Sequence, residues 1–175
     1  FNACVHCYPT PMGTLPNTVS IVLPAKNEAE GLRRALPGLR AALPEAEVIV
    51  VDDGSSDETA QVADSLGARV LTTPYSMGNG AAIKRGARAA QGDVIVFMDA
   101  DGQHDASHIH ALLAKLEEGF DMVVGARGRG GQANVGRGLA NAFYNRLASW
   151  MTGHRILDLT SGFRAVRADR FREFL

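Results

Sequence analysis

Short apolar runs alternate with stretches of helical periodicity along this chain, and that alternation constrains the fold more than any other feature. The expected strands span residues 19–24, 48–51, 69–72, 94–98 and 121–124. Helical patterns lie over residues 28–43, 56–66, 80–90 and 106–118. Runs that are apolar throughout are typical of strands buried on both faces of a sheet. The sequence therefore predicts an α/β fold, with a largely parallel sheet and helices on both faces.

The chain is long enough, at 175 residues, for one domain with a full-sized core. We expect residues 1–17 to be a poorly ordered leader and residues 18–175 to form the domain, with a Gly/Arg-rich loop over 127–138 and a helix over 139–151. The chain starts with Phe and ends in an interrupted helical pattern, so we expect a C-terminally truncated domain. The leader holds both cysteines as a C-x2-C pair, whereas a structural zinc site usually takes two such pairs.

Charge is divided unevenly along the chain. Residues 1–126 carry nine Lys and Arg against sixteen Asp and Glu, a net charge of −7. Residues 127–175 carry nine Arg against three acids, a net charge of +6. The planar guanidinium of Arg suits phosphate groups, so this division indicates phosphate-bearing partners, with a solvated, charge-balanced surface as the alternative. No run approaches the roughly 18 apolar residues of a membrane span.

Polar motifs follow the expected strands at their carboxyl ends, where ligands of such sheets bind. The motifs are Pro24-Ala25-Lys26-Asn27-Glu28, Asp52-Asp53-Gly54-Ser55-Ser56-Asp57 and Gly78-Asn79-Gly80, the last with Lys84 one helical turn further on. Asp52 and Asp53 point to opposite sides of an extended strand, so we expect one to face a ligand and the other to order the loop. Ser56 or Asp57 is expected to cap the next helix. The third motif predicts a helix N-terminus that approaches a ligand closely.

Two carboxylates one residue apart, those of Asp99 and Asp101, come directly after the strand over 94–98. Burying such a pair is costly unless a positive group lies between them. A hard divalent cation, Mg²⁺ or Mn²⁺, is the natural occupant, and it can also hold the phosphates of a nucleotide. Gln103 and His104 add further polar groups within one turn. The alternative is an ordinary strand-to-helix loop with a capping aspartate.

Taken together, these motifs resemble family 2 glycosyltransferases of the GT-A fold. The segment over 158–164, Asp-Leu-Thr-Ser-Gly-Phe-Arg, is similar to a signature of dolichol-phosphate mannosyltransferases and polyprenyl-phosphate sugar transferases. The resemblance extends over about residues 19–170. It implies an inverting glycosyltransferase that moves a sugar from a nucleotide-diphospho-sugar to a polyprenyl or dolichyl phosphate.

The resemblance also implies roles for individual residues. Those expected to bind the nucleotide-sugar are Pro24, Lys26, Asn27, Glu28, Asp53, Gly80, Lys84, Asp99, Ala100 and Asp101. The expected metal ligands are Asp99, Asp101 and Gln103. Contacts to donor or acceptor phosphates are expected from Arg127, Ser161 and Arg164. The residues expected to take part in catalysis are Asp101, Arg127 and Arg164, with Asp158 as the reserve base for a hydroxyl acceptor.

A lipid phosphate is already ionised near neutral pH, so the implied reaction needs no strong general base. We expect a cytoplasmic protein in peripheral contact with the inner face of the cell membrane, and no nucleic-acid partner. One alternative is a family 2 enzyme that acts on a sugar hydroxyl in cell-wall or polysaccharide synthesis. A nucleotidyltransferase is a second, although the expected Gly-rich signature after the first strand is missing. A nucleotide-binding fragment without turnover is the third.

Overall fold

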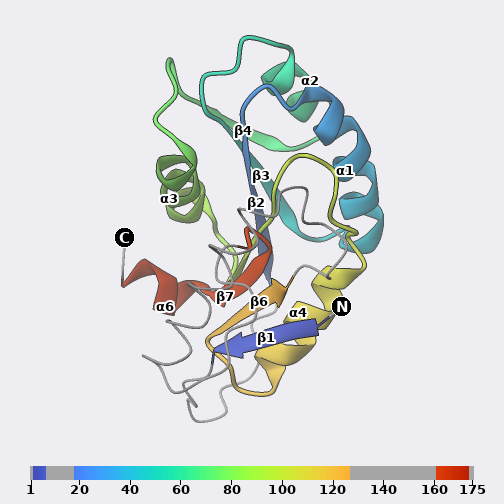
Figure 1. Ribbon diagram of the computed structural model, residues 1–175, viewed down its shortest axis with the longest axis vertical. Coiled ribbons are helices and arrows are strands. Elements are labelled where there is room, and N and C mark those ends of the chain that lie inside the picture. The colour runs from blue at the N-terminus through green and yellow to red at the C-terminus, as the bar shows by residue number, and fades with distance from the viewer. Residues whose placement is uncertain (1, 7–17, 127–160, 174–175) are drawn as a thin grey trace, which may run out of the picture.

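The computed structural model describes residues 2–6, 18–126 and 161–173, and within them seven strands form one sheet in the order β1-β6-β7-β5-β2-β3-β4 (Figure 1). The strands are β1 (Asn2–His6), β2 (Val19–Ala25), β3 (Glu47–Asp52), β4 (Arg69–Thr72), β5 (Val94–Phe97), β6 (Met122–Ala126) and β7 (Arg164–Arg167). The helices are α1 (Ala29–Ala42), α2 (Thr59–Ser65), α3 (Asn79–Ala89), α4 (His108–Glu117) and α6 (Ala168–Arg172). The predicted α/β class is confirmed.

The sheet is largely parallel, as predicted. β2 pairs in parallel with β3 and β5, and β3 pairs in parallel with β4. The expected parallel series is interrupted by β7, which lies antiparallel between β5 and β6. Its sequence, Arg-Ala-Val-Arg, has only two apolar residues, which is too short a run to predict a strand.

The leader differs from the expectation over residues 2–6. These residues form β1, which pairs antiparallel with β6 so that Cys4 lies opposite Val124. The exposed edge of β6 offers unpaired backbone groups to a neighbouring segment, and this pairing satisfies them. The remainder of the leader, the expected loop over 127–138 and the expected helix over 139–151 lie outside the described residues.

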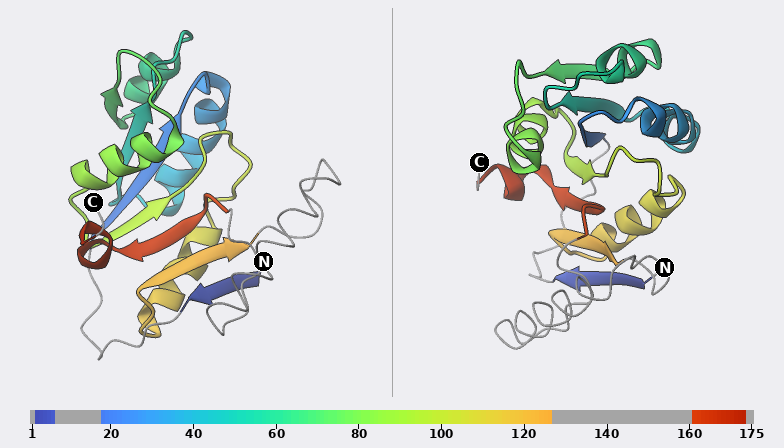
Figure 2. Two further views of the ribbon diagram at one scale, coloured as in Figure 1. Left: turned by 60° about the vertical axis from the view of Figure 1, so that its left-hand side comes forward. Right: turned by 45° about the horizontal axis from the view of Figure 1, so that its top comes forward.

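Helices cover both faces of the sheet, which the views in Figure 2 show from two sides. Alternate residues of β2 enter two separate cores because side chains alternate across a strand. Ile21 and Leu23 join the core beneath α1, α2 and α4, whereas Val22 joins the core beneath α3 and α6. Among the described residues, no helix is both long and apolar enough to cross a membrane.

Strand register brings the polar motifs to one edge of the sheet. Ala25 at the end of β2 lies opposite Asp52 at the end of β3, and Asp52 lies opposite Thr72 at the end of β4. β5 runs in the same direction beside β2, with Phe97 opposite Val22. The loops that follow β2, β3, β4 and β5 therefore meet at the carboxyl edge, where the sequence predicts ligand binding.

The packing of α3 against the sheet depends on Gly86. A Cβ at this position would lie 2.3 Å from Val22 Cγ1 and 3.0 Å from Val51 Cγ2. Gly38 in α1 is a matched contrast, since a Cβ there would meet nothing within 4 Å.

We expect Gly86→Ala to destabilise the fold by about 1–3 kcal/mol, because overpacking pushes α3 away from β2 and β3. Gly38→Ala should instead stabilise it by up to about 1 kcal/mol, because alanine favours the helix without a steric cost. Urea unfolding of both variants measures the two effects. Equal free energies of unfolding for the two variants would contradict this account of α3 packing.

Candidate active site

A hollow of about 230 Å³ lies at the carboxyl edge of the sheet, between the ends of β2 and β3 and the start of α3. Its lining residues are Pro24, Ala25, Lys26, Asp53, Ser76, Gly78, Asn79 and Ala82. The structure thus brings together three of the predicted nucleotide-binding residues, Pro24, Lys26 and Asp53. Helix α3 begins at this hollow, and the positive end of its dipole favours an anionic ligand there.

The start of α3 has the open geometry that a close ligand approach requires. Gly78 adopts a φ of 91°, in the left-handed region that favours glycine. A Cβ at Gly80 would meet nothing within 4 Å, so packing does not explain this glycine. Lys84 is exposed one turn further along α3. A phosphate contact at this turn stays a prediction.

Asp53 organises the loop that forms one wall of this hollow. Its carboxylate accepts hydrogen bonds from the backbone N–H groups of Met77 (2.7 Å) and Gly78 (2.8 Å) and from Ser76 Oγ (2.7 Å). Only 5% of Asp53 is exposed. The N–H of Met77 is the main cause that holds the pKa of Asp53 below its usual range, and the other donors add to it. The carboxylate is therefore ionised and engaged with its own loop.

Asp52 has a comparable local role, since its Oδ1 accepts a hydrogen bond from the backbone N–H of Ser55 at 3.0 Å. One of the two aspartates was expected to face a ligand and the other to order the loop. In the structure both of them order loops, Asp52 the turn after β3 and Asp53 the segment before α3. Ligand contact by Asp53 remains a prediction.

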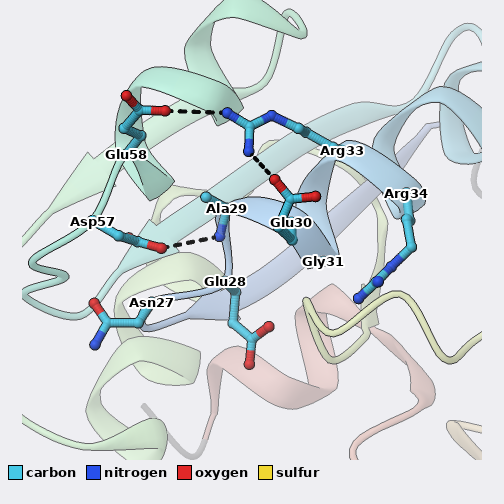
Figure 3. Close-up of a pocket in the computed structure, with 9 residues that line it drawn as sticks. All are labelled: Asn27, Glu28, Ala29, Glu30, Gly31, Arg33, Arg34, Asp57 and Glu58. Atoms are coloured by element: carbon cyan, nitrogen blue, oxygen red, sulfur yellow. Dashed lines mark hydrogen bonds and ion pairs between the residues drawn. The ribbon is translucent and has the colours of Figure 1, made fainter.

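Figure 3 shows a second hollow, of about 380 Å³, at the start of α1. Two of the predicted nucleotide-binding residues, Asn27 and Glu28, line it and do not line the hollow beside α3. Asn27 has a φ of 56°, and its Oδ1 accepts a hydrogen bond from the backbone N–H of Ser56 at 2.8 Å. The structure therefore divides the predicted nucleotide-binding set between two neighbouring surfaces.

We expected Ser56 or Asp57 to cap α2, but the N-cap residue is Glu58, whose side chain makes no capping hydrogen bond, and Asp57 lies one residue before it. Its Oδ1 accepts a hydrogen bond from the N–H of Thr59 at 3.0 Å, and its Oδ2 accepts one from the N–H of Ala29 at 3.3 Å (Figure 3). The Thr59 hydroxyl is the main cause that lowers the pKa of Asp57. One carboxylate thus satisfies the first turns of both α1 and α2.

The segment over residues 99–103, here called the carboxylate loop, follows β5. Asp99 and Asp101 lie on it, and 44% of the Asp99 side chain is exposed. Asp101 Oδ1 accepts a hydrogen bond from the backbone N–H of Gln103 at 2.9 Å, while Gln103 itself is exposed. Ala100 between them is buried. The two carboxylates therefore stand at the carboxyl edge of the sheet, as predicted.

The donor chemistry of this loop fits a divalent cation that takes some of its ligands from elsewhere. Within the part of the chain that the structure describes, no three His, Cys, Asp or Glu side chains converge as a metal cluster. The predicted ligands, Asp99, Asp101 and Gln103, do not by themselves form a closed site. An open, oxygen-rich site is what Mg²⁺ or Mn²⁺ uses when phosphate oxygens and water complete its coordination.

His104 lies beside the carboxylate loop. Its Nε2 is 3.7 Å from Asp99 Oδ2, and its ring stacks on Phe163 with centroids 4.9 Å apart and planes 17° apart. Phe163 belongs to the Ser161-Gly162-Phe163-Arg164 signature, here called the signature segment. This segment therefore packs directly against the loop that carries the acidic pair.

Ser161 is a structural residue of the signature segment. Its hydroxyl donates a hydrogen bond to the carbonyl of Gly125 at 2.6 Å and accepts one from the N–H of Phe163 at 3.3 Å. Only 3% of it is exposed. We expected Ser161 to contact a phosphate. The structure buries Ser161 and engages its hydroxyl with β6, and contact with a phosphate stays a prediction.

Arg164 lies behind the acidic pair, with its guanidinium 5.2 Å from the centre of the Phe97 ring. Burial lowers the pKa of this guanidinium, and the charge of Asp99 works against that shift. Its Nε is buried without a hydrogen-bond partner. Arg164 thus places positive charge near Asp99, and its contact with a phosphate stays a prediction. Arg127 and Asp158 lie outside the described residues.

Gly162 permits Asp99 to approach the signature segment. A Cβ at this position would lie 2.5 Å from Asp99 Oδ1 and 2.7 Å from Oδ2. No side chain larger than hydrogen fits there while Asp99 keeps its place. Glycine is therefore required at this position for a steric reason, because a larger residue would displace the carboxylate of Asp99.

Sequence reasoning missed several of these contributions. The donors to Asp53 follow β4 without a recognisable pattern, and the partners of the signature segment lie far away in the sequence. Gly31 inside the helical pattern over 28–43 was the one available signal, since a glycine there usually has a packing or functional reason. The structure provides that reason, because a Cβ on Gly31 would lie 2.2 Å from the carbonyl oxygen of Ala100.

Comparisons with known proteins agree with this arrangement. The family model described as glycosyl transferase family 2 matches residues 20–175. The chain belongs to this family. The predicted family is confirmed.

Two curated relatives bear names that match the predicted branch. The chain is 37% identical over 169 residues to an undecaprenyl-phosphate mannosyltransferase of Micrococcus luteus, covering 88% of this chain and 68% of the relative. It is 35% identical over 163 residues to an undecaprenyl-phosphate 4-deoxy-4-formamido-L-arabinose transferase of Proteus mirabilis, covering 86% of this chain and 49% of the relative. The chain thus spans about half to two thirds of these relatives.

Solved structures confirm the predicted GT-A-like fold. A glucosyl-3-phosphoglycerate synthase of Mycobacterium tuberculosis, in complex with Mn²⁺, UDP-glucose and phosphoglyceric acid, has a TM-score of 0.72 at 28% identity. The match covers 87% of this chain and 57% of that chain. A mannosyl-3-phosphoglycerate synthase of Rubrobacter xylanophilus also has a TM-score of 0.72, at 26% identity, over 88% of this chain and 54% of that one.

We expect Gly162→Ala to weaken Mn²⁺-dependent binding of a nucleoside diphosphate by about tenfold or more, because the added methyl group displaces the Asp99 carboxylate and metal sites tolerate only small changes in ligand distance. Gly38→Ala is the control, since its methyl group points into open space. Calorimetric titration with UDP and Mn²⁺ measures the effect. Unchanged affinity in Gly162→Ala would show that Asp99 is not a ligand of the bound group.

We expect Asp53→Asn to destabilise the protein by about 1–3 kcal/mol at neutral pH, because the amide loses charged hydrogen bonds to the loop. The pKa of Asp53 is lowered in the folded state. Its stabilising contribution is therefore fully present above the unfolded pKa of about 3.9 and is lost as pH falls through the folded value.

The measurement is urea unfolding of the parent and of Asp53→Asn between neutral pH and pH 3, with Asp64→Asn on the exposed surface of α2 as control. The stability difference between parent and Asp53→Asn should shrink as the pH falls below about 4. A difference that stays constant down to pH 3 would argue against an ionised, loop-binding Asp53.

Proposed function

We propose that this chain is the catalytic domain of an inverting glycosyltransferase that moves a sugar from a nucleotide-diphospho-sugar to a polyprenyl phosphate. The observation that carries the proposal is the Asp99 and Asp101 pair, which stands at the carboxyl edge of the sheet in a chain of glycosyl transferase family 2. The hollow beside α3 opens at the same edge and supplies a place for the nucleoside.

The donor is proposed to bind across this edge. Pro24, Lys26 and the loop that Asp53 holds would enclose the base and ribose in the hollow of about 230 Å³. The start of α3, with Gly80 and Lys84, would face the diphosphate. Asn27 and Glu28 would then approach the ribose from the neighbouring surface at the start of α1.

A divalent cation, Mg²⁺ or Mn²⁺, is proposed to be held by Asp99 and Asp101. When bound, the cation would supply Lewis-acid stabilisation of the departing diphosphate. Gly162 leaves room for Asp99, His104 Nε2 lies 3.7 Å from its carboxylate, and Arg164 adds positive charge near it. The Mn²⁺ in the related synthase structure supports the use of a divalent cation without distinguishing the two metals.

The acceptor is proposed to be a polyprenyl phosphate reached at the inner surface of the cell membrane. The names of the Micrococcus and Proteus relatives support this acceptor class. The net charge of +6 over residues 127–175 suits both a phosphate nucleophile and an anionic lipid surface. Arg127 is proposed to contact a phosphate together with Arg164, and Asp158 stays the reserve base for a hydroxyl acceptor.

A small phosphorylated acceptor is the second candidate. It is favoured by the structural similarity to a synthase in complex with phosphoglyceric acid. That acceptor would be soluble, so its product would stay in the aqueous phase. Extraction into organic solvent therefore separates the two candidates directly.

The test is transfer of radiolabelled sugar from a panel of nucleotide-sugars, with Mn²⁺, to undecaprenyl phosphate in detergent, using the protein that contains this chain. We expect label in the organic phase and a loss of about 100-fold or more in Asp101→Ala, because a main electrostatic stabiliser of the departing diphosphate is lost. Asp64→Ala on α2 is the matched control and should retain activity.

Transfer to phosphoglyceric acid, with none to undecaprenyl phosphate, would replace the lipid by the soluble acceptor. Full activity of Asp101→Ala would contradict the assignment of the carboxylate pair. Nucleotide-sugar binding without transfer to either acceptor would favour a binding domain over an enzyme.

A further inference from the structure

We propose that Arg34 is a positioning residue that holds the carboxylate loop in place for the cation. The Nη2 of Arg34 donates a hydrogen bond to the carbonyl oxygen of Asp101 at 3.1 Å, from a position 67 residues earlier in the sequence. The inference rests on the proposed function for its consequence, since the loop carries the proposed metal ligands. The contact itself is a property of the fold.

Close backbone packing makes the position of α1 decisive for this loop. A Cβ on Gly31 would lie 2.2 Å from the carbonyl oxygen of Ala100 and 2.9 Å from the Cα of Asp101. Gly102, with a φ of 74°, faces the helix in return, since its Cβ would lie 3.1 Å from the carbonyl oxygen of Gly31. Helix and loop thus meet backbone to backbone at two glycines.

Arg34 lies one turn after Gly31 and extends this contact. A Cβ on Gly102 would lie 3.2 Å from both Cβ and Nε of Arg34, so the arginine side chain runs along the loop before its guanidinium reaches Asp101. The two glycines bring the backbones together, and the Arg34 hydrogen bond fixes the loop at the residue that carries the second carboxylate.

The neighbouring Arg33 provides an internal contrast on the same helix. Its guanidinium pairs with Glu30 and with Glu58, the second at 3.2 Å, and so ties α1 to the start of α2. Figure 3 shows the two arginine side chains pointing in different directions, Arg33 toward the glutamates and Arg34 away from them. Both residues are exposed. Replacing either one therefore removes one charge and one long side chain from one helix surface, but only Arg34 contacts the carboxylate loop.

The loop needs such a contact because β5 ends at Phe97 and α4 begins only at His108. Residues 99–103 therefore lack the ladder of hydrogen bonds that fixes a strand or a helix. Mg²⁺ requires near-ideal octahedral geometry, so a displacement of Asp101 weakens its contribution to a cation site. A guanidinium holds a carbonyl with a rigid, planar donor set, which lysine reproduces only in part.

The first test is amide hydrogen exchange of residues 99–104 in the metal-free protein. We expect this segment to exchange about fivefold faster or more in Arg34→Ala than in the parent, because the loop opens more easily without the hydrogen bond from Arg34. Arg33→Ala should exchange like the parent over this segment. Arg34→Lys should restore part of the protection. Equal exchange in Arg34→Ala and Arg33→Ala would overturn the proposal.

The second test is Mn²⁺ binding in the presence of UDP, followed by the electron paramagnetic resonance signal of free Mn²⁺. Arg34→Ala should raise the dissociation constant of Mn²⁺ about tenfold, whereas Arg33→Ala should stay within about twofold. Faster exchange with unchanged Mn²⁺ affinity would overturn the inferred role toward the cation. If Arg34→Ala lowers the melting temperature, hydrogen exchange and Mn²⁺ affinity are measured in Arg34→Lys instead. Values equal to those of the parent in both measurements would then overturn the proposal.

The two readouts separate this inference from the proposed function. A parent protein that binds no Mn²⁺ contradicts the proposed metal site. Hydrogen exchange still decides in that case whether Arg34 holds the loop.

Discussion

Parallel pairing of β2 with both β3 and β5 is the constraint on which the whole site depends. Because the three strands run in the same direction in fixed register, the loops after them emerge at one edge, although they lie far apart in the sequence. The apolar residues that fill both cores fix this register, since a slip by one residue would exchange the two faces of each strand. The placement of the polar loops is therefore a consequence of core packing.

The acidic residues at this edge divide into two kinds. The carboxylates of Asp52, Asp53 and Asp57 accept hydrogen bonds from backbone N–H groups and thereby order the turns after β3 and before α3. Asp99 and Asp101 lie on a partly exposed loop. This loop contacts α1 and also contacts the signature segment. The two groups differ in the loops that carry them, since Asp101 also accepts a backbone hydrogen bond, from the N–H of Gln103.

Much of the fold could be predicted from the sequence, because the spacing of apolar residues indicates which face of each helix or strand is buried. The elements from β2 to β6 lie within a few residues of their expected bounds. β7 could not be predicted in the same way, since its short Arg-Ala-Val-Arg run becomes a strand only through pairing with β5 and β6. β1 likewise depends on a partner more than a hundred residues away.

The site was predicted less completely than the fold. Motif positions identified the edge, and the family match supports that identification. The partners of Asp53, the burial of Ser161 and the contact between Arg34 and Asp101 are properties of folded geometry. No local sequence pattern records a hydrogen bond between residues that only the assembled sheet brings together.

The pairing around Gly125 has a consequence for how members of such a family can diverge. The chain leaves the sheet after β6 and re-enters it at the signature segment, and two hydrogen bonds close this point: Ser161 Oγ donates to the carbonyl of Gly125, and the N–H of Gly125 donates to the carbonyl of Phe163. The intervening residues therefore begin and end at one fixed place. Lengthening such a closed excursion costs little, because loop entropy grows only with the logarithm of its length. Insertions between β6 and the signature segment would therefore leave both hydrogen bonds, and the carboxylate loop beside them, in position.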